Sequence, residues 1–375
     1  MQAWLIYNPV AGHRDVEPEL LKAQEYLQAQ GWQVRLCRTE GAGHAAQLSR
    51  EARDAGVQVA VAVGGDGTIG QVVDGLVNSN TRLGVIPAGT GNVWARMVGI
   101  PVWGPSNRNG IVDAARVLVE GVTRRVDVGW VDGRHFLLWA GLGFDAQVAQ
   151  EVEPHREVRR TLGNMTYIVA GLAQGLVMRG ERTTVIVDGR IYRQRLLMLL
   201  VSNAQLYGPL LAMAPEAKLD DGLLDVYLFK GTNTFDTLRH LTSVLTGTQS
   251  MDPQIEYYQA RHVSVITEHP WPVHVDGDPF GNTPVNIEVI PRSLQVIVPR
   301  WAPNDLFQEG GFESRRSPTL VGRVTAQLHS LTERWQEERR RLERRERERL
   351  AAFQAERHPP SETRAEDAAS PEPRP

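Results

Sequence analysis

A strand-like segment that ends in a glycine-rich turn constrains this chain more than any other part of its sequence. Residues 57–63 are valines and alanines around one glutamine, and Gly64-Gly65-Asp66-Gly67-Thr68 follow at once, before a helical pattern begins near Ile69. Glycines between a strand and a helix let backbone N–H groups approach an anion, and the helix dipole favours negative charge there. The spacing matches neither the P-loop nor the dinucleotide fingerprint. The segment therefore predicts a phosphate-binding turn.

Residues 1–125 alternate short apolar runs with helical patterns. Strands are expected at 3–7, 33–37, 57–63 and 83–86, and helices at 17–30, 43–55, 70–78, 92–98 and 111–120. Strands that alternate with helices are typical of βαβ units, so we predict an α/β lobe built on a doubly wound parallel sheet.

Two further glycine-bearing turns follow strands of this predicted sheet. Asn8-Pro9-Val10-Ala11-Gly12 ends the first strand, and Pro87-Ala88-Gly89-Thr90-Gly91-Asn92 ends the fourth. The carboxyl ends of parallel strands share one edge, which is where ligands of open α/β sheets bind. We therefore expect the three turns to meet at that edge.

The pattern changes to a period of two from about residue 124. Strands are expected at 125–131, 135–140, 183–187, 194–201, 223–229, 262–267, 285–290 and 293–298, with helices near 158–179 and 233–245. This pattern predicts an antiparallel β-sandwich. The expected organisation is an α/β nucleotide-binding lobe at 1–125, a β-rich substrate lobe at 126–303, and an extension at 304–375.

Composition narrows the class of protein. The 375 residues carry a net charge of −3, which gives no single-sign field and argues against a general nucleic-acid binder. The one cysteine, Cys37, allows no internal disulfide, and no basic-then-apolar leader precedes the first strand, so we expect an intracellular protein. The most apolar non-strand stretch, 165–178, is shorter than the roughly 20 residues of a membrane span.

The extension at 304–375 contains a charged helical segment near 320–357 and a tail rich in proline, serine and glutamate. Its apolar residues form a narrow seam: Val321, Val324, Leu328, Leu331 and Trp335. Three interpretations stay open, namely a solvated charged helix before a disordered tail, a short coiled coil that forms a homo-oligomer, and a membrane-surface helix.

Taken together, the three turns resemble the diacylglycerol-kinase catalytic-domain family, which includes sphingosine and ceramide kinases and bacterial soluble lipid kinases. The resemblance continues in the β half, in the same order as in the family, and covers about residues 1–300. Its further motifs are Gly141-Leu142-Gly143-Phe144-Asp145-Ala146, Gly163 with Tyr167, the run from Ala214 to Asp225, and Val275-Asp276-Gly277-Asp278.

The resemblance implies an NAD-kinase-like α/β lobe that binds ATP. The nucleotide phosphates would be held by Gly64, Gly65, Asp66, Gly67 and Thr68, and the ATP site would be completed by Asn8, Gly12, Thr39 and Thr90. Asp66 could also hold or orient Mg²⁺, because Mg²⁺ prefers one or two carboxylates with waters and phosphates.

Two acidic motifs of the β half complete the implied site. Bacterial members place a structural Mg²⁺ at the first, which here would be bound by the Asp221 side chain and the backbone oxygens of Lys218 and Leu223. The second motif usually ends in a glutamate that accepts the hydroxyl proton, and this chain has Asp278 instead. The side chain is one methylene shorter, so Asp66 and Asp276 remain alternative bases.

The function implied is an ATP- and Mg²⁺-dependent kinase of a membrane-lipid hydroxyl, most simply diacylglycerol to phosphatidic acid. Such an enzyme would be cytoplasmic, would bind the membrane surface transiently at the inner leaflet, and would bind no nucleic acid. Two alternatives stay open. One is a kinase of a soluble acceptor such as NAD, since NAD kinases share the Gly-Gly-Asp-Gly-Thr loop; the other is a catalytically silent regulator that binds nucleotide or lipid.

Overall fold

The computed structural model describes residues 1–375 except 10–11, 13–14, 105–106, 144–179, 209–210 and 309–375. Residues 1–313 form one compact unit and 314–375 a separate one. The helices expected near 158–179 and 320–357 therefore lie outside the described residues, as do the seam and tail of the extension. No helix among the described residues is long and apolar enough to cross a bilayer.

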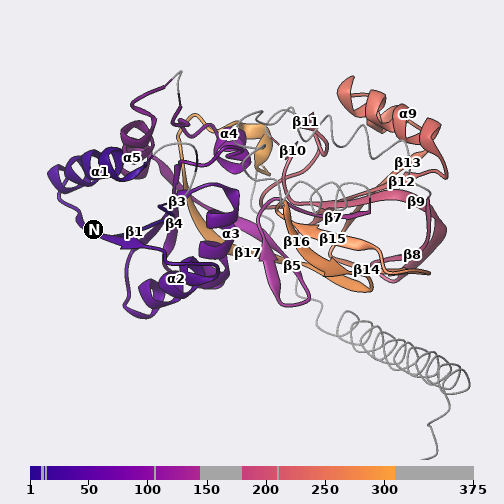
Figure 1. Ribbon diagram of the computed structural model, residues 1–375, viewed down its shortest axis with the longest axis horizontal. Coiled ribbons are helices and arrows are strands. Elements are labelled where there is room, and N and C mark those ends of the chain that lie inside the picture. Colours follow the sequence, from indigo (N-terminus) through magenta and orange to yellow (C-terminus); the bar gives the residue numbers. More distant parts are fainter. Residues whose placement is uncertain (10–11, 13–14, 105–106, 144–179, 209–210, 309–375) are drawn as a thin grey trace, which may run out of the picture. The chain divides into compact units, whose positions relative to one another are not determined.

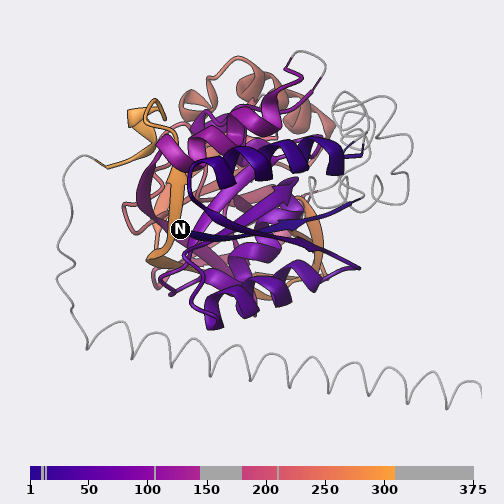
Figure 2. The same cartoon turned by 90° about the vertical axis from the view of Figure 1, so that its left-hand side faces the viewer.

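The first part of the chain folds into the predicted parallel sheet. Its strands are β1 (Gln2–Tyr7), β2 (Gln33–Arg38), β3 (Val59–Gly64) and β4 (Arg82–Pro87), in the order β2-β1-β3-β4. Its helices are α1 (Glu17–Ala29), α2 (His44–Asp54), α3 (Asp66–Leu76), α4 (Val93–Val98) and α5 (Gly110–Glu120). The helix α1 packs against α5, and α2 packs against α3. Figure 2 shows the strands between α1 on one side and α2 on the other.

The second part is mostly antiparallel β-structure (Figure 1). Its strands are β5 (Val122–Val131), β6 (Arg134–Phe136), β7 (Trp139–Gly143), β8 (Glu181–Val187), β9 (Arg190–Ser202), β10 (Leu206–Tyr207), β11 (Leu211–Ala212), β12 (Leu224–Lys230), β13 (Ile255–Ala260), β14 (His262–Thr267), β15 (Pro272–Val275), β16 (Asp278–Asn282) and β17 (Val285–Val298). Three helical elements accompany them: α9 (Thr234–Leu245), η2 (Gln249–Met251) and η3 (Asn304–Leu306). A second hydrophobic core fills this part, with members such as Leu199, Val226, Val265, Val273 and Ile287.

Several boundaries differ from the sequence expectation. The predicted strand at 135–140 is two strands, because the N–H groups of Leu137 and Leu138 bind the Asp276 carboxylate instead of a neighbouring strand. The predicted strands at 285–290 and 293–298 are one, β17, whose register shifts between Ile290 and Leu294. The helix α3 begins at Asp66 rather than at 70, although glycines disfavour helix in isolation.

The strand β17 joins the two parts of the chain. It pairs antiparallel with β5 and β14. Near its end it pairs parallel with β4, where Val296 lies opposite Leu83. All strands except β10 and β11 therefore belong to one continuous sheet among the described residues, and the last strand completes the sheet of the first part.

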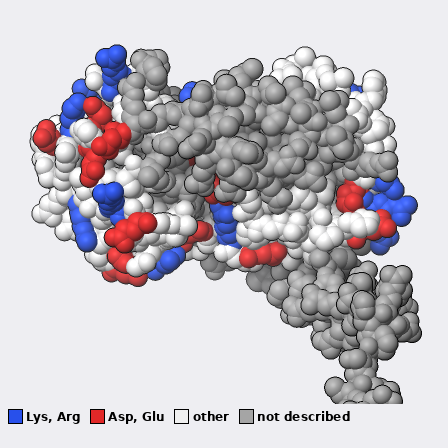
Figure 3. Space-filling model, viewed as in Figure 1, with Lys and Arg blue, Asp and Glu red and all other residues white. Residues whose placement is uncertain are grey.

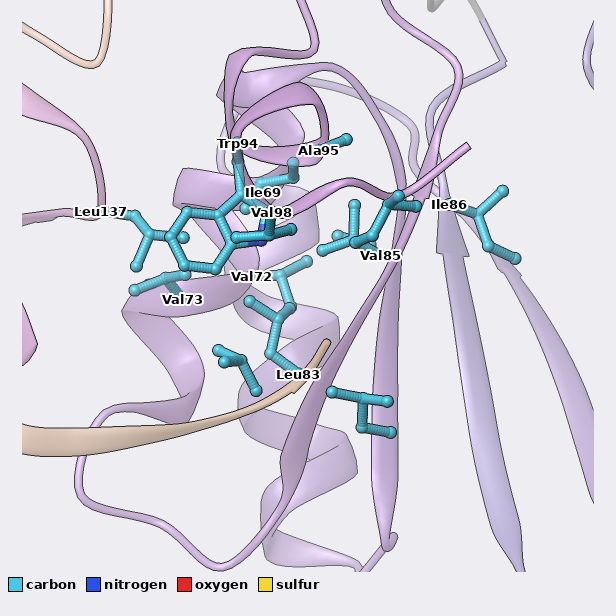
Figure 4. Close-up of a cluster of buried hydrophobic side chains, with 14 of the residues drawn as sticks. Ile69, Val72, Val73, Leu83, Val85, Ile86, Trp94, Ala95, Val98 and Leu137 are labelled. Atoms are coloured by element: carbon cyan, nitrogen blue, oxygen red, sulfur yellow. The ribbon is translucent and has the colours of Figure 1, made fainter. Parts of the chain in front are cut away.

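A buried hydrophobic cluster holds the elements that carry the glycine-rich turns (Figure 4). It combines residues of α3, β4 and α4 with Leu137: Ile69, Val72, Val73, Leu83, Val85, Ile86, Trp94, Ala95 and Val98. Trp94 is 1% exposed and is among the largest fully buried side chains. Burying each large apolar side chain contributes about 1.5–3 kcal/mol, so this cluster fixes the turns relative to one another.

Candidate active site

The three glycine-bearing turns meet at one edge of the parallel sheet, as the sequence predicts. Tyr7 lies opposite Val63, and Gly64 lies opposite Pro87, so β1, β3 and β4 end side by side. The Asn8 N–H donates to the Val63 carbonyl at 3.2 Å. The Thr39 N–H donates to the Tyr7 carbonyl at 2.9 Å, which brings Thr39 to the same edge.

The turns approach one another so closely that side chains would not fit between them. A Cβ on Gly89 would lie 2.4 Å from the Cα atom of Gly65. Gly12 has φ +72°, and a Cβ there would lie 2.3 Å from the Ala88 carbonyl oxygen. These glycines therefore allow backbone-to-backbone contact between the turns, which brings the three turns together at one edge of the sheet.

Asp66 ties the glycine-rich turn to the helix that follows the third turn. Its carboxylate accepts hydrogen bonds from the N–H groups of Val93, at 3.0 Å, and Trp94, at 3.2 Å. These donors begin α4, where a helix has unpaired N–H groups. Burial raises the pKa of Asp66, although these backbone donors favour the charged form. Asp66 thus has a positioning role that the sequence did not reveal.

Asn92 holds the third turn in shape. It adopts a left-handed backbone, φ +49°, and is 1% exposed. Its side-chain oxygen accepts from the Gly89 N–H at 3.0 Å, and its amide donates to the Gly89 carbonyl at 2.7 Å. The sequence analysis placed Asn92 in the motif without a role. The sequence did contain a signal for this role, because asparagine tolerates a left-handed backbone and its side chain can form hydrogen bonds with the backbone of a Gly-x-Gly turn.

Asp276 occupies the first position of the tight turn between β15 and β16. Both Asp276 and Gly277 have positive φ, and Val275 pairs with Asp278 across the turn. The Asp276 carboxylate accepts from the N–H groups of Leu137, Leu138 and Trp139, at 2.9 to 3.0 Å. Burial raises the pKa of Asp276 to about 6 in spite of these donors. This carboxylate anchors the turn to the segment between β6 and β7.

Asp278 lies beside the glycine-rich turn, and its carboxylate is bound by an arginine side chain. Its side chain is 49% exposed, and its carboxylate forms an ion pair with Arg134 at 2.9 Å. A Cβ on Gly67 would lie 3.5 Å from an Asp278 carboxylate oxygen, so Asp278 lies against the start of α3. No backbone N–H bond to this carboxylate is found among the described residues. Geometry therefore favours Asp278 over Asp66 and Asp276 as a proton acceptor.

Arg134 reaches Asp278 because its strand is held against α3. The ring nitrogen Nδ1 of His135 lies 2.9 Å from the Asp74 carboxylate, and the His135 N–H donates to the same oxygen at 3.1 Å. The sequence analysis missed Arg134, which sits in an ordinary Asp-Gly-Arg turn. Nothing local marks this residue, since only the fold brings it to Asp278.

The predicted metal turn brings the partly buried carboxylate of Asp221 near the buried carboxylate of Asp127. Asp221 accepts from the Leu223 N–H at 3.0 Å, and burial, followed by the charge of Asp220, raises its pKa. Asp127 is fully buried and accepts from the N–H groups of Gly222 and Arg292, both at 2.6 Å. Burial raises the pKa of Asp127 to about 6.

Burial disfavours negative charge on these carboxylates, and Lys218 offsets it only in part at Asp221, so a hard cation bound by oxygen atoms suits this turn. The Lys218 side chain binds the Asp305 carbonyl. The sequence analysis assigned no role to Asp127. The available signal was its position, because a charged residue in the middle of the apolar strand pattern at 125–131 indicates a buried carboxylate with specific partners.

Comparison with known proteins agrees with this architecture. Residues 2–131 match the family model "Diacylglycerol kinase catalytic domain", and residues 139–298 match "YegS C-terminal NAD kinase beta sandwich-like domain". The diacylglycerol kinase of Bacillus subtilis (strain 168) is 30% identical over 301 residues, which cover 80% of this chain and 97% of that protein. A Staphylococcus aureus diacylglycerol kinase is 28% identical over 310 residues, 82% of this chain and 94% of the relative.

Solved structures give the same result. The crystal structure of a diacylglycerol kinase from Bacillus anthracis matches with a TM-score of 0.66 and 26% identity, and the match covers 80% of this chain and 97% of that one. The second part of the chain is thus the β-sandwich-like domain expected from its period of two. The matched sequence, the shared fold and the three glycine-bearing turns lead to one conclusion: the chain belongs to the diacylglycerol-kinase catalytic-domain family.

Proposed function

We propose that this protein transfers the γ-phosphate of ATP to the hydroxyl of a membrane lipid, with diacylglycerol as the first candidate. The observation that carries the proposal is the half-exposed carboxylate of Asp278 against Gly67 of the phosphate-binding turn. A proton acceptor beside a phosphate site is what transfer to an alcohol requires. The named relatives support the kinase class, and the lipid itself is our proposal.

Each part of the site has a task in this reaction. The glycine-rich turn at 64–68 and the neighbouring turns bind the phosphates of the substrate MgATP. The lipid hydroxyl oxygen forms a bond to the γ-phosphorus while the bond from that phosphorus to the bridging oxygen of ADP breaks. Asp278 takes the hydroxyl proton, and Arg134 holds the shortened carboxylate in place through their ion pair.

A second Mg²⁺ fits the turn that carries Asp221. The Asp221 carboxylate would hold it with the backbone oxygens of Lys218 and Leu223, and the ion would neutralise the charge of buried carboxylates there. The enzyme would work in the cytoplasm, where ATP is available, and would bind transiently to the inner leaflet.

The test is phosphate transfer from γ-labelled ATP, with Mg²⁺, to detergent-dispersed diacylglycerol, monoacylglycerol, sphingosine and ceramide, with NAD as a soluble acceptor. Asp278→Asn should lower turnover about 10²–10⁴-fold, the usual contribution of a general base. Asp278→Glu should keep activity, because the longer side chain reaches farther into the same space. Asp113→Asn is the matched control, since Asp113 also pairs with an arginine, Arg116, at 3.3 Å on the exposed side of α5.

A labelled lipid that disappears with Asp278→Asn and persists with Asp113→Asn would support the proposal. Labelled NAD without labelled lipid would favour the soluble-acceptor alternative. The family description of the second domain, which names an NAD-kinase-like β-sandwich, supports this alternative. Folded protein that binds ATP and labels no acceptor would favour a catalytically silent regulator.

A further inference from the structure

The helix α9 and the following turn η2 expose large apolar side chains to solvent. Phe235 is 74% exposed, Leu238 and Leu245 are each 57% exposed, and Met251 is 85% exposed. With Thr242, the three residues of α9 follow a 3-4-3 spacing, which places them along one side of a helix. Four of the nine large hydrophobic residues exposed among the described residues therefore gather here. We call Phe235, Leu238, Leu245 and Met251 the α9 stripe.

The side of α9 that faces the protein buries one polar residue, His240, and one residue of the hydrophobic core, Val244. His240 is 6% exposed, and its Nε2 atom lies 2.6 Å from the Lys230 carbonyl oxygen. The hydroxyl of Ser243 donates to the carboxylate of Asp252 at 3.0 Å, and Arg239 binds the same carboxylate. A surface helix of a globular protein normally buries its apolar side and exposes its polar side. The helix α9 buries Val244 but leaves Phe235, Leu238 and Leu245 exposed. This excess of exposed apolar side chains indicates that its outer side meets an apolar partner.

The α9 stripe carries no charge that would select an ionic partner. The charged side chains of α9 are Asp236 and Arg239: Asp236 accepts from the Thr232 N–H at 2.8 Å, and Arg239 binds Asp252. Figure 3 shows the corner of the surface over α9 to be mostly neutral. Attraction at this surface would therefore be hydrophobic, and it would depend little on salt.

The size of the α9 stripe argues against a second protein chain as its partner. Its four side chains offer roughly 500 Å² of exposed surface, whereas a stable protein interface needs about 800 Å² from each partner. A lipid bilayer needs no such matching surface, because aromatic and aliphatic side chains of one helix face can enter the boundary between headgroups and acyl chains.

A path of contacts connects α9 with the candidate active site. The Gln249 side chain donates to the Ala212 carbonyl of β11 at 2.7 Å, and β11 pairs with β10. Tyr207 of β10 stacks on Trp139, with ring centroids 4.7 Å apart. The Trp139 N–H in turn binds Asp276, two residues before Asp278. The α9 stripe is thus connected, through η2, β11 and β10, to the turn that carries the proposed base.

We propose that the α9 stripe is the surface through which this protein docks on a lipid bilayer. This inference rests on the proposed function, in which the substrate is a membrane lipid, and adds the residues that bring the enzyme to it. Phe235, Leu238, Leu245 and Met251 enter the headgroup region, while the charged side of α9 stays bonded to the protein.

The first test is co-sedimentation of the full chain with phosphatidylcholine vesicles, with and without phosphatidylglycerol, at low and high salt. The double variant Leu238→Glu/Leu245→Glu should weaken binding at least about tenfold on both vesicle types, because it places two charges where apolar groups enter the bilayer. Ile191→Glu is the matched control, since Ile191 is also 57% exposed but lies on β9. It should leave binding unchanged, and wild-type binding should persist at high salt.

A second measurement locates the surface directly. The chain has one cysteine, Cys37, which is buried. Leu245→Cys can therefore be labelled with an environment-sensitive dye, with Ile191→Cys as its counterpart. Emission of the dye at position 245 should shift to the blue when vesicles are added, and emission at position 191 should not change.

Equal vesicle binding by wild type and the double variant would overturn the inference, and so would wild-type binding that disappears at high salt. A fall in melting temperature confined to the double variant would show that another part of the chain covers the α9 stripe. A wild-type dimer that the double variant converts to monomer would show that a second copy covers it. Phosphate transfer to detergent-dispersed lipid is measured separately. If wild type transfers no phosphate to lipid, the proposed function is contradicted, and the vesicle-binding result still applies to the docking surface.

Discussion

Three aspartates that the sequence could not rank are distinguished by what their carboxylates bind. Asp66 accepts from two backbone N–H groups of α4, and Asp276 accepts from the two residues between β6 and β7 and from the first residue of β7. Asp278 binds the side chain of Arg134 and remains half-exposed. Backbone donors fix a carboxylate and leave it few free lone pairs, whereas a partly exposed one can turn toward a substrate. Asp66→Asn would therefore disturb α4 as well as any chemistry.

The buried carboxylate of Asp276 makes stability depend on pH. Its folded pKa of about 6 lies above the ordinary 3.8, so its stabilising contribution is full below about 3.8 and is lost as pH rises through about 6. Asp276→Asn removes this titration. We expect the unfolding free energy of Asp276→Asn relative to wild type to rise by up to roughly 3 kcal/mol from acid to neutral pH. Urea unfolding at both pH values checks this, and a constant difference would contradict it.

Two glycines of the site should respond in opposite ways to the same added methyl group. In Gly89→Ala, the new Cβ would overlap the Gly65 backbone at 2.4 Å, so we expect a loss of about 1–3 kcal/mol in stability and weaker ATP binding. In Gly67→Ala, the Cβ would make an ordinary 3.5 Å contact with Asp278, inside a helix that favours alanine. That variant should melt no lower than wild type but turn over more slowly. Thermal melts and ATP titrations check both, and equal melting temperatures would contradict the account.

At the scale of elements, tertiary bonds decide where strands and helices begin. The apolar run at 135–140 has the alternation of one strand, yet the Asp276 carboxylate takes the N–H groups of its middle residues and divides it. The strands β13, β15 and β16 were missed. β13 is rich in polar residues, β15 has four residues, and β16 contains Pro279 and Gly281. Such segments form strands because their neighbours supply the missing hydrogen bonds.

The helix α9 was predicted correctly, at 233–245, and its start depends on one side chain. Asn233 accepts from the N–H groups of Phe235, at 2.9 Å, and Asp236, at 3.2 Å. Asn233→Ala should cost about 1 kcal/mol. Amide exchange at Phe235 and Asp236 should then be about fivefold faster. Asn233→Asp, which keeps an acceptor, should restore the wild-type rate. Unchanged exchange in the alanine variant would show that α9 does not depend on this cap.

At the scale of the whole molecule, β17 makes the two matched domains one folding unit. It leaves the β-sandwich-like part and pairs with β4, and Val296, Ile297 and Val298 are buried. A chain that ends after the first matched domain would leave the edge of β4 unpaired and part of the first core uncovered. The two family models therefore divide residues 1–298 into two sequence domains, but these domains depend on each other for stability.

Truncation tests this interdependence. A fragment of residues 1–131 lacks β17, and we expect it to show no cooperative thermal transition, because its exposed apolar surface and open sheet edge cost more than its own helices supply. A fragment of residues 1–313 should melt cooperatively, as a compact unit does. Circular dichroism during heating distinguishes the two. A cooperative transition in the shorter fragment would mean that the parallel sheet is stable alone.

The sequence by itself determined the elements whose signals are local. The alternation of strands and helices, the three glycine-bearing turns and their meeting at one sheet edge follow from periodicity and from the geometry of parallel strands. The ATP and Mg²⁺ assignments to these turns remain predictions.

Only the tertiary structure decided the rest, since it depends on residues far apart in the chain. Arg134 meets Asp278 across 144 positions, Asp276 divides a strand 138 positions away, and β17 closes a sheet that begins at Gln2. No periodicity encodes such pairs, because long-range contacts are selected by the packing of the whole chain.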